Sequence, residues 1–257
     1  MHGGHRQILL CRYQGEPWPA GLRLALATLA LMLACMTEPL LPTEMTLDEL
    51  RAALTPLLPQ EAAFDGWTDA ALASAARTLG VPEDRARLAF PGGAVEMIDA
   101  WFAMIDLQMF ATVPPERIAT MKIRERIRAL VLARLEAAAP YREALRGALA
   151  VLARPDHAAR AIGLGWRAAD RMWRLAGDTA TDFNHYTKRA TLGALYTATL
   201  LAWMDDDSED WTETRAFLDR RIDDVLRFEK LKAKLRPDPE RHFSPTRFLG
   251  RLRYPAV

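Results

Sequence analysis

The stretch GWTDAALASAARTLGVPEDRARLAFPGG, residues 66–93, decides the fold of this 257-residue chain. Its first part, DAALASAARTL, repeats alanine and leucine at spacings of three and four residues, which predicts a short amphipathic helix. Gly80 can adopt the left-handed conformation that ends such a helix, and Pro82 can open the next one. Two short helices joined by a glycine turn are typical of a helix-turn-helix motif.

The rest of the chain from Thr46 onward also has a helical pattern. Apolar residues recur at three and four, and the alternation of Val, Ile and Thr that marks strands is rare. Thr46 and Glu49 have the spacing of a capping box at the first helix. The sequence therefore predicts an all-α fold. Glycine and proline breaks place the helices near residues 46–58, 68–79, 83–90, 94–111, 115–138, 141–152, 156–176, 182–204, 212–235 and 245–253.

Composition divides the chain into four parts. Residues 1–44 contain the apolar run GLRLALATLALMLAC, which is shorter than the about 20 residues of a membrane span. Two interpretations are open for this part. It is the h-region of a signal peptide, or it is translated upstream sequence and the protein starts at Met36 or Met45; we favour the second interpretation. The remaining parts are a helix-turn-helix-like headpiece (45–93), a helical bundle (94–235), and a linker with a short amphipathic C-terminal helix (236–257).

The headpiece has the helix-turn-helix pattern without the charge of a DNA reader. The net charge of the chain is +1, so bulk charge does not point to nucleic acid. The second helix of the motif offers Glu83, Asp84, Arg85 and Arg87, whose charges sum to zero, whereas phosphate contact requires cations. We therefore expect no nucleic-acid partner.

Catalytic and metal-binding patterns are missing from the sequence. No serine lies in a G-x-S-x-G elbow, and no histidine has the spacing of a zinc or di-iron helix site. The only cysteines are Cys11 and Cys35. The acidic run at residues 205–210 could hold magnesium or could cap the helix that follows, and the capping interpretation is favoured. We expect no catalytic residue and no metal site, and hence a protein that is not an enzyme.

The C-terminal segment is cationic and has one apolar face. Ser244 can cap a helix that Pro245 opens. Such a helix could lie in a membrane interface, or its apolar face could dock on the bundle, and the sequence leaves both open. The predicted membrane-contact residues are Phe248, Leu249, Arg251 and Leu252.

One long segment carries a family resemblance. WRLAGDTATDFNHYTKRATLGALYTATLLAWMDDDSEDWTETRAFLDRRIDDV, residues 173–225, resembles the ubiquinone-biosynthesis accessory family known as the ninth Coq protein, a lipid-binding relative of TetR-type regulators. The ending FPGG of the headpiece motif is similar to the close of the TetR-type DNA-binding headpiece. The residues that carry the resemblance include Trp173, Gly177, Asp178, Asp182, Phe183, Asn184, Tyr186, Thr187, Lys188, Arg189, Leu192, Tyr196, Ser208, Thr214, Phe217 and Arg221.

The resemblance implies a TetR-like homodimer that has exchanged DNA binding for lipid binding. Such a protein binds an isoprenoid quinone intermediate and assists demethoxyubiquinone hydroxylase at the membrane surface. No cofactor other than this bound lipid is expected. Composition suggests a GC-rich bacterial genome, so we expect a bacterial cytoplasmic protein that is peripheral on the inner membrane. The alternative function is a TetR-type ligand-responsive transcriptional repressor.

The resemblance implies one set of site residues, a partner surface, and the apolar residues of the predicted helices 94–111 and 182–204 supply a second set, the candidates for lipid binding. The partner surface for the hydroxylase comprises Met172, Trp173, Asp182, His185 and Tyr186, although the family typically has a large aromatic residue where this chain has His185. A polyprenyl chain has no polar groups, so its site must be an apolar cavity between helices. The candidate lipid-binding residues are Trp101, Met104, Ile105, Leu195, Tyr196 and Trp203.

Overall fold

The computed structural model describes the backbone of residues 44–178 and 183–235, and the side chains of residues 44–178 and 185–228. The chain divides into two compact units, Met1–Met45 and Thr46–Val257, and almost all of the described residues belong to the second unit. Within the described ranges every regular element is a helix and there is no strand. This confirms the predicted all-α class.

Four short helices form the headpiece: α2 (Leu47–Leu54), α3 (Leu58–Asp65), α4 (Asp69–Leu79) and α5 (Glu83–Ala89). The predicted capping box begins α2, because the Thr46 hydroxyl accepts the Glu49 N–H at 3.3 Å and the Glu49 carboxylate accepts the Thr46 N–H at 2.8 Å. Gly80, with φ 74°, makes the left-handed turn that ends α4. The helices α4 and α5 thus form the predicted helix-turn-helix.

The predicted helix 46–58 is broken in the structure, and most of the helix that follows the break lies beyond the predicted range. The helix α2 ends at Leu54, because Pro56 has no backbone N–H with which to continue the helical hydrogen bonds. A separate helix, α3, begins at Leu58 with Pro59 in its first turn, where a missing N–H costs nothing. The predicted end at residue 58 was therefore wrong, and the sequence reasoning missed α3.

The predicted helix 115–138 is also divided, into α7 (Pro115–Ala119) and α8 (Ile123–Ala138). Lys122 between them is extended, with ψ 156°, and its N–H donates to the Glu125 carboxylate at 3.0 Å. The second part therefore starts with its own cap, in which Glu125, three residues after Lys122, accepts the N–H of the residue before the helix.

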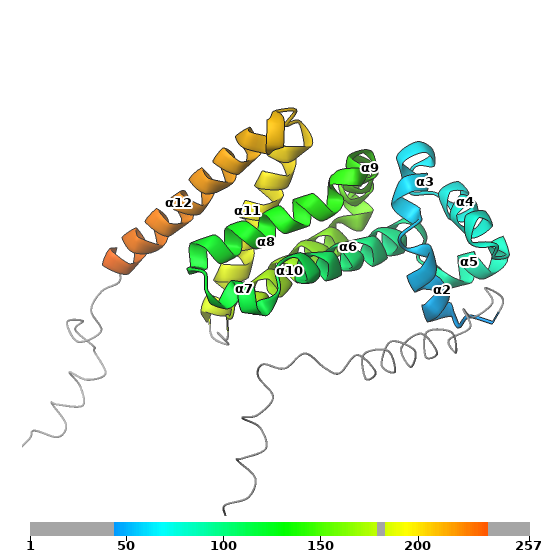
Figure 1. Ribbon diagram of the computed structural model, residues 1–257, viewed down its shortest axis with the longest axis horizontal. Coiled ribbons are helices and arrows are strands. Elements are labelled where there is room, and N and C mark those ends of the chain that lie inside the picture. The colour runs from blue at the N-terminus through cyan, green and yellow to red at the C-terminus, as the bar shows by residue number, and fades with distance from the viewer. Residues whose placement is uncertain (1–43, 179–182, 236–257) are drawn as a thin grey trace, which may run out of the picture. The chain divides into compact units, whose positions relative to one another are not determined.

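The bundle follows the headpiece. Its long helices are α6 (Gly93–Thr112), α8, α9 (Arg142–Leu152), α10 (Ala158–Leu175), α11 (Phe183–Met204) and α12 (Thr212–Leu235). The helix α10 packs against α11, α6 packs against α8, and α12 packs against both α11 and α8 (Figure 1). The largest buried side chains of the bundle include Trp101 on α6 and Trp203 on α11. The predicted helix 245–253 lies outside the described residues.

The helix α9 packs against the headpiece helix α3. The Trp67 indole N–H, from the start of the helix-turn-helix, donates to the backbone carbonyl of Ala144 on α9 at 2.8 Å. The ring of Trp67 also lies 5.3 Å from that of Trp101 on α6. A buried indole that finds both a hydrogen-bond acceptor and an aromatic neighbour fixes the two parts against each other.

The core between α6, α8 and α10 contains charged groups. Asp106 on α6 and Arg134 on α8 are 1% and 2% exposed and form an ion pair. Arg171 on α10 lies 2.9 Å from the other carboxylate oxygen of Asp106, and the Arg134 guanidinium lies 5.1 Å from the ring centroid of Tyr196. Burial, and then the nearby Arg167 and Arg134, lower the pKa of Arg171. These charges are tolerated in the interior because they are paired.

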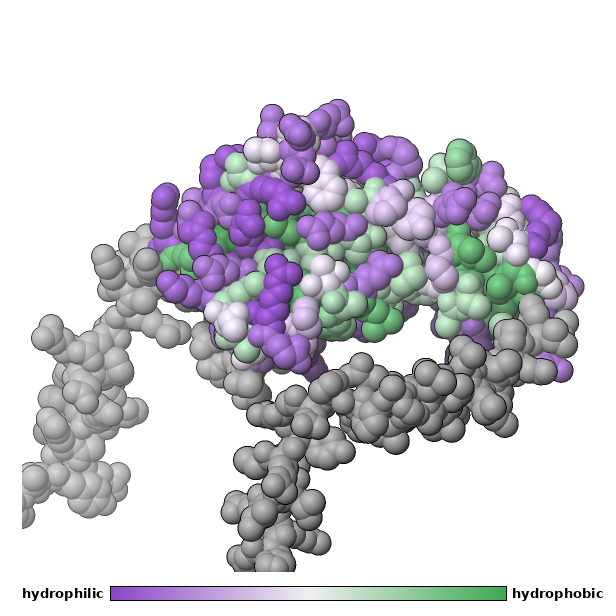
Figure 2. All heavy atoms as spheres, viewed as in Figure 1, coloured by the Kyte–Doolittle hydropathy of each residue, from purple (hydrophilic) through white to green (hydrophobic). Residues whose placement is uncertain are grey.

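The described surface is polar over much of the bundle. Figure 2 shows apolar atoms gathered over the headpiece, where Phe64 and Leu88 are 87% and 62% exposed. In the part of the chain that the structure describes, no single helix has the length and apolarity of a membrane span. The pair α5 and α6, bent by 71° at the break between them, meets that criterion by length and composition only.

Candidate functional site

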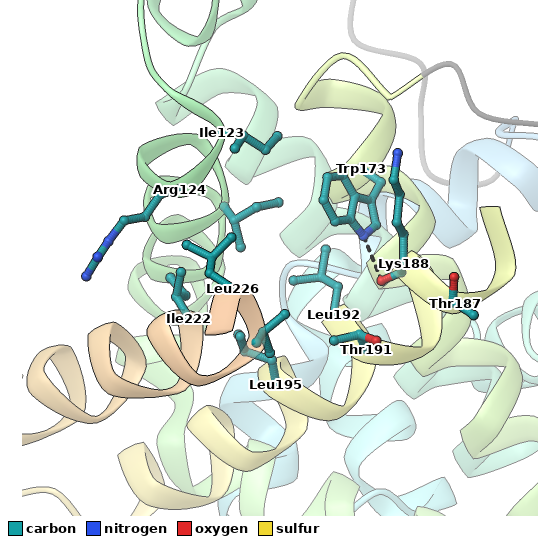
Figure 3. Close-up of a pocket in the computed structure, with 12 residues that line it drawn as sticks. Ile123, Arg124, Trp173, Thr187, Lys188, Thr191, Leu192, Leu195, Ile222 and Leu226 are labelled. Atoms are coloured by element: carbon teal, nitrogen blue, oxygen red, sulfur yellow. Dashed lines mark hydrogen bonds between the residues drawn. The ribbon is translucent and has the colours of Figure 1, made fainter. Parts of the chain in front are cut away.

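An apolar pocket of about 200 Å³ opens between α8, α10, α11 and α12. Leucine, isoleucine and valine side chains make most of its wall, and one indole ring, that of Trp173, lies at its edge (Figure 3). Such a wall favours ligands with hydrocarbon parts. The lining residues are Ile123, Arg124, Ile127, Trp173, Thr187, Lys188, Thr191, Leu192, Leu195, Ile222, Val225 and Leu226.

Helical spacing explains which side chains reach the pocket. Lys188, Leu192 and Leu195 on α11 are separated by four and three residues and therefore share one face. Ile222 and Leu226 on α12 are related in the same way. The two faces meet because α11 and α12 pack against each other and α8 covers them.

Trp173 and Lys188 are linked at the wall of the pocket. The Trp173 Nε1–H donates to the backbone carbonyl of Lys188 at 2.8 Å, and the Lys188 Nζ lies 5.5 Å from the centroid of the same ring. The Lys188 ammonium also donates to Asp178 Oδ1 at 2.5 Å. The lysine is therefore held at both ends, by its carbonyl and by its ammonium group.

Arg189 lies beneath this corner and is 2% exposed. It donates to Asp170 on α10 at 2.6 Å and to Asp178 at 3.1 Å. Burial raises the pKa of Asp170, but hydrogen bonds from Arg189 and Arg174 outweigh that effect and hold the pKa below its usual value. The motif residues Asp178 and Arg189 thus fix the junction of α10 and α11. Sequence reasoning saw them as part of the motif but assigned them no role.

The predicted lipid-binding residues do not come together in one cavity. Leu195 lines the pocket. Trp101, Ile105 and Trp203 are buried core residues at most 2% exposed, and they do not line it. Tyr196 packs under Arg134, in the charged part of the core.

Met104, the last of these candidates, lines a different groove. This groove, of about 440 Å³, lies between α2, α6 and α10. Ion pairs of Arg51 with Glu96 and of Arg160 with Asp99 border it. Its charged border distinguishes it from the aliphatic pocket.

Sequence reasoning missed the pocket residues on α8 and α12. Ile127, Ile222 and Leu226 stand in ordinary amphipathic patterns, and such patterns show only that a side chain faces inward. Ile222 lies within the quoted family segment, residues 173–225, but was given no role. Which inward side chains border a cavity depends on how neighbouring helices pack.

The predicted partner residues are distributed over three environments. Met172 is 0% exposed, so its side chain offers no surface to a partner, and Trp173 lies in the pocket wall. His185 and Tyr186 lie near the surface, with ring centroids 5.2 Å apart. Asp182 lies outside the described residues, as do the membrane-contact residues Phe248, Leu249, Arg251 and Leu252.

Trp166 on α10 adds a ring that the sequence reasoning missed. Its centroid lies 6.0 Å from that of Tyr186 and 6.4 Å from that of His185. Tyr186 is 61% exposed and Trp166 is 36% exposed, while Ile162 on the next turn of α10 is 73% exposed. These four residues form an aromatic and aliphatic surface, which we call the aromatic patch. Exposed aromatic groups of this kind are typical of protein contacts.

The acidic run after α11 is a cap. Asp206 is 5% exposed and accepts hydrogen bonds from the N–H and hydroxyl groups of Ser208 and Thr214, at 2.5–2.9 Å. Burial raises the pKa of Asp206, but these hydrogen bonds outweigh that effect and hold the pKa far below its usual value. The Thr214 N–H belongs to the first turn of α12, which is the end that a carboxylate stabilises.

No metal cluster is found among the described residues. Nowhere in those ranges do three or more His, Cys, Asp or Glu side chains group in a way that could hold an ion. Within the acidic run, Asp206 is explained by its hydrogen bonds to Ser208 and to Thr214 in the first turn of α12.

The charged side chains of the helix-turn-helix pair with one another. Arg77 lies 3.2 Å from Glu83, and Arg87 lies 3.8 Å from Glu83 and 3.6 Å from Asp84. Each of these pairs sets an arginine against a carboxylate of the same motif, which offsets the attraction that DNA phosphates would exert.

Comparison with known proteins connects this geometry to a family. Residues 158–229 match the family model described as COQ9. These residues contain α10, α11 and the first part of α12, and so most of the pocket and the whole aromatic patch.

Curated relatives carry the same name. The "Ubiquinone biosynthesis protein COQ9, mitochondrial" of Rattus norvegicus is 33% identical over 168 residues, which are 63% of this chain and 54% of the rat protein. The Homo sapiens protein of that name is 32% identical over 168 residues, covering 63% of this chain and 52% of the human protein. The chain therefore spans about half the length of the curated relatives it matches.

The relatives correct one expectation. They are mitochondrial proteins of eukaryotes, which contradicts the expected bacterial cytoplasmic location on the inner membrane. That expectation rested on amino-acid composition, which reflects coding bias and carries no physical signal for a compartment.

A solved structure shares the fold. The crystal structure of the TetR transcriptional regulator from Nitrosomonas europaea ATCC 19718 is similar with a TM-score of 0.58 and 26% sequence identity, covering 69% of this chain and 98% of that chain. This confirms the predicted TetR-like architecture. The family model, the curated relatives and the TetR-like fold together show that this chain resembles the COQ9 family.

Proposed function

We propose that the protein is a non-catalytic, lipid-binding accessory protein of ubiquinone biosynthesis. It binds an isoprenoid quinone intermediate in the pocket between α8, α10, α11 and α12, and presents it to demethoxyubiquinone hydroxylase at a membrane surface. The observation that carries the proposal is the position of the pocket beside the aromatic patch, since both are built on the first turns of α11.

The pocket suits part of such a ligand. Its aliphatic wall matches an isoprenoid chain, which binds by burial of apolar surface and needs no polar partner. Its volume of about 200 Å³ is below the about 300–1,000 Å³ that encloses a drug-sized ligand. A longer polyprenyl ligand would therefore extend through the mouth, where a second protein or a membrane can take it over.

The aromatic patch suits the protein partner. Thr187 and Lys188 line the pocket, whereas His185 and Tyr186 precede them directly on α11 and belong to the aromatic patch. A partner bound there would lie within about one helical turn of the pocket wall. This arrangement supports direct transfer of a ligand between two proteins.

The proposal includes a non-catalytic role, because the charged groups around the pocket serve the fold. Asp178 is paired with Lys188 and Arg189, and Arg124 is paired with Asp219 and Asp223. Groups that are fully paired in this way make poor general acids or bases.

The proposal also includes a homodimer and a membrane surface, as the family resemblance implies. Analytical ultracentrifugation would test the homodimer, and flotation with liposomes would test the membrane contact. A monomer at micromolar concentration would refute the homodimer, and absence of flotation would refute the membrane contact.

Native mass spectrometry of the purified protein tests the central proposal. We expect an isoprenoid lipid to co-purify with the wild-type chain. Thr191→Trp, in the pocket wall, should fill the space and abolish the lipid load. Thr197→Trp is the matched control, because Thr197 is an exposed threonine of the same helix, and it should keep the load. A wild-type protein without any isoprenoid would refute the proposal.

A TetR-type repressor is the alternative, favoured by the helix-turn-helix headpiece and by the likeness to a TetR regulator. A mobility-shift assay decides between the two. Specific, tight binding to DNA upstream of the gene would establish the repressor, whereas the paired arginines of the motif lead us to expect none.

A further inference from the structure

Lys188 differs from an ordinary surface lysine because the fold holds it in place. A free lysine side chain carries about 2 kcal/mol of rotamer entropy. Here the ammonium donates to Asp178 at 2.5 Å, and the indole of Trp173 holds the carbonyl of Lys188 at 2.8 Å. Asp178 is itself fixed by the buried Arg189. The cation is thus preorganised at the wall of a mainly aliphatic pocket.

The ammonium has donors to spare. A lysine ammonium carries three N–H donors, and the bond to Asp178 uses one of them. Arg124, the other cation in the wall, is engaged by Asp223 and Asp219 on α12 and points away from Trp173 in Figure 3. Lys188 is therefore the better placed of the two to donate to a ligand.

The indole of Trp173 gives this part of the wall a flat aromatic face. Its N–H is already used by the Lys188 carbonyl, so the ring can offer a ligand only its apolar surface. Flat rings pack on such a surface in offset or edge-to-face arrangements. A flat face beside a preorganised cation fits a planar ring that bears oxygen acceptors, and it gives an isoprenoid chain alone no advantage.

We propose that Trp173 and Lys188 form a head-group subsite, at which the ring of a quinone or quinol packs on the indole and one ring oxygen accepts a hydrogen bond from the lysine ammonium. The aliphatic wall from Leu192, Leu195 and Ile222 then takes the first part of the chain. This inference rests on the proposed lipid-binding function. It adds that Lys188 makes the site prefer a quinone to a prenol, which has no ring oxygen to accept the hydrogen bond.

The same donor could hold the carboxylate or phosphate of another lipid. The flat face of the Trp173 indole favours a quinone ring, because a ring can stack on it and the chain of an acyl lipid cannot. The ligands in the test must therefore separate three head groups on short chains: a ubiquinone with a geranyl side chain, geraniol, and decanoate.

The experiment measures the affinity of each ligand for the full chain and three variants by titration calorimetry. Lys188→Met keeps the stem and removes the ammonium, and Lys188→Arg keeps a donor. Hydrogen bonds to charged groups lead us to expect that Lys188→Met weakens quinone binding about ten- to hundredfold. Geraniol binding should change less than about threefold, and Lys188→Arg should keep most of the quinone affinity.

Asp178→Asn tests whether Lys188 acts only on the fold. This variant loosens the same ion pair but leaves the ammonium in place. If Lys188 were purely structural, Asp178→Asn and Lys188→Met would weaken every ligand to the same extent, and that result would overturn the inference. Thermal melting of each variant accompanies the titrations and reports the loss of fold separately.

The remaining outcomes are also decisive. Unchanged quinone affinity in Lys188→Met overturns the subsite. Decanoate bound more tightly than the quinone, with the larger loss in Lys188→Met, overturns the ring in favour of an anionic head group. A wild-type chain that binds neither the quinone nor geraniol refutes the proposed function itself, whereas binding of both without any effect at Lys188 refutes only the subsite.

Discussion

The Trp173 indole N–H donates to the backbone carbonyl of Lys188 across 2.8 Å and so ties the last turns of α10 to the start of α11. Lys188, in turn, lies 5.5 Å over the ring of Trp173 through its ammonium. The wall of the pocket and the first turns of α11 are therefore held together. His185 and Tyr186 of the aromatic patch come shortly before Lys188 on the same helix.

Replacing Trp173 with Phe tests this link. The variant keeps an aromatic wall but loses the hydrogen bond, which we expect to cost about 1–2 kcal/mol. Amide hydrogen exchange should accelerate in the first turns of α11. Trp211→Phe, whose ring lies against Trp203 at the other end of α11, is the control and should leave that exchange unchanged. Equal exchange rates in both variants would show that the link does not hold α11.

The buried ion network between Asp106, Arg134 and Arg171 should be costly to break. Asp106→Asn keeps the shape of the side chain but leaves the two arginines without their counter-charge. We expect a loss of about 3–5 kcal/mol in the free energy of unfolding, measured by urea denaturation. Asp224→Asn, in an exposed pair with Arg221, should cost less than about 1 kcal/mol. Similar losses in the two variants would contradict a special role for the buried network.

Asp206 should make the stability of the protein pH-dependent. Its pKa is lower in the folded chain than the about 3.9 of an unfolded aspartate, so its contribution is complete above that pH and is lost as the pH falls below it. At pH 7 Asp206→Asn should be less stable than the wild type by about 1–3 kcal/mol. Urea denaturation at a series of pH values should show this difference shrinking below about pH 4.

The neighbouring Asp207 supplies the control for that experiment. Its side chain is 99% exposed, so Asp207→Asn should follow the wild-type curve at every pH. A difference at Asp206 that stayed constant down to pH 2 would mean that the carboxylate charge does not stabilise α12.

The aromatic patch should contribute to partner affinity. Tyr186→Ala removes a 61% exposed ring that contacts Trp166 and His185, and we expect it to weaken binding of demethoxyubiquinone hydroxylase by about tenfold or more. Lipid load and melting temperature should stay at wild-type values, because the ring is outside the pocket. Leu201→Ala, another exposed apolar residue of α11, is the matched control. Equal affinity of both variants for the hydroxylase would remove the aromatic patch from the interface.

Local signals in the sequence were sufficient to predict most of the helices. The capping box at Thr46, the left-handed Gly80 and the periodicity of α10 to α12 each depend on residues a few positions apart, and the structure has each of them. The missed break at Pro56 was also local and could have been found from the proline, whereas Lys122 is not one of the residue types that mark a helix start in a sequence. The ordered motif of residues 173–225 was enough to recognise the family.

The sequence by itself thus determined the fold class, the helix-turn-helix, the family resemblance and the presence of a set of polar residues around the junction of α10 and α11. Only the tertiary structure decided what those residues do. Asp178 and Arg189 form an ion pair inside the protein. The pocket lies in the space that α8 and α12 enclose with α10 and α11, and not beside the core tryptophans as the sequence had suggested. The reason is physical: a helical pattern shows which side faces inward, but whether an inward side chain fills the core or borders a cavity depends on the shapes of neighbours far away in the chain.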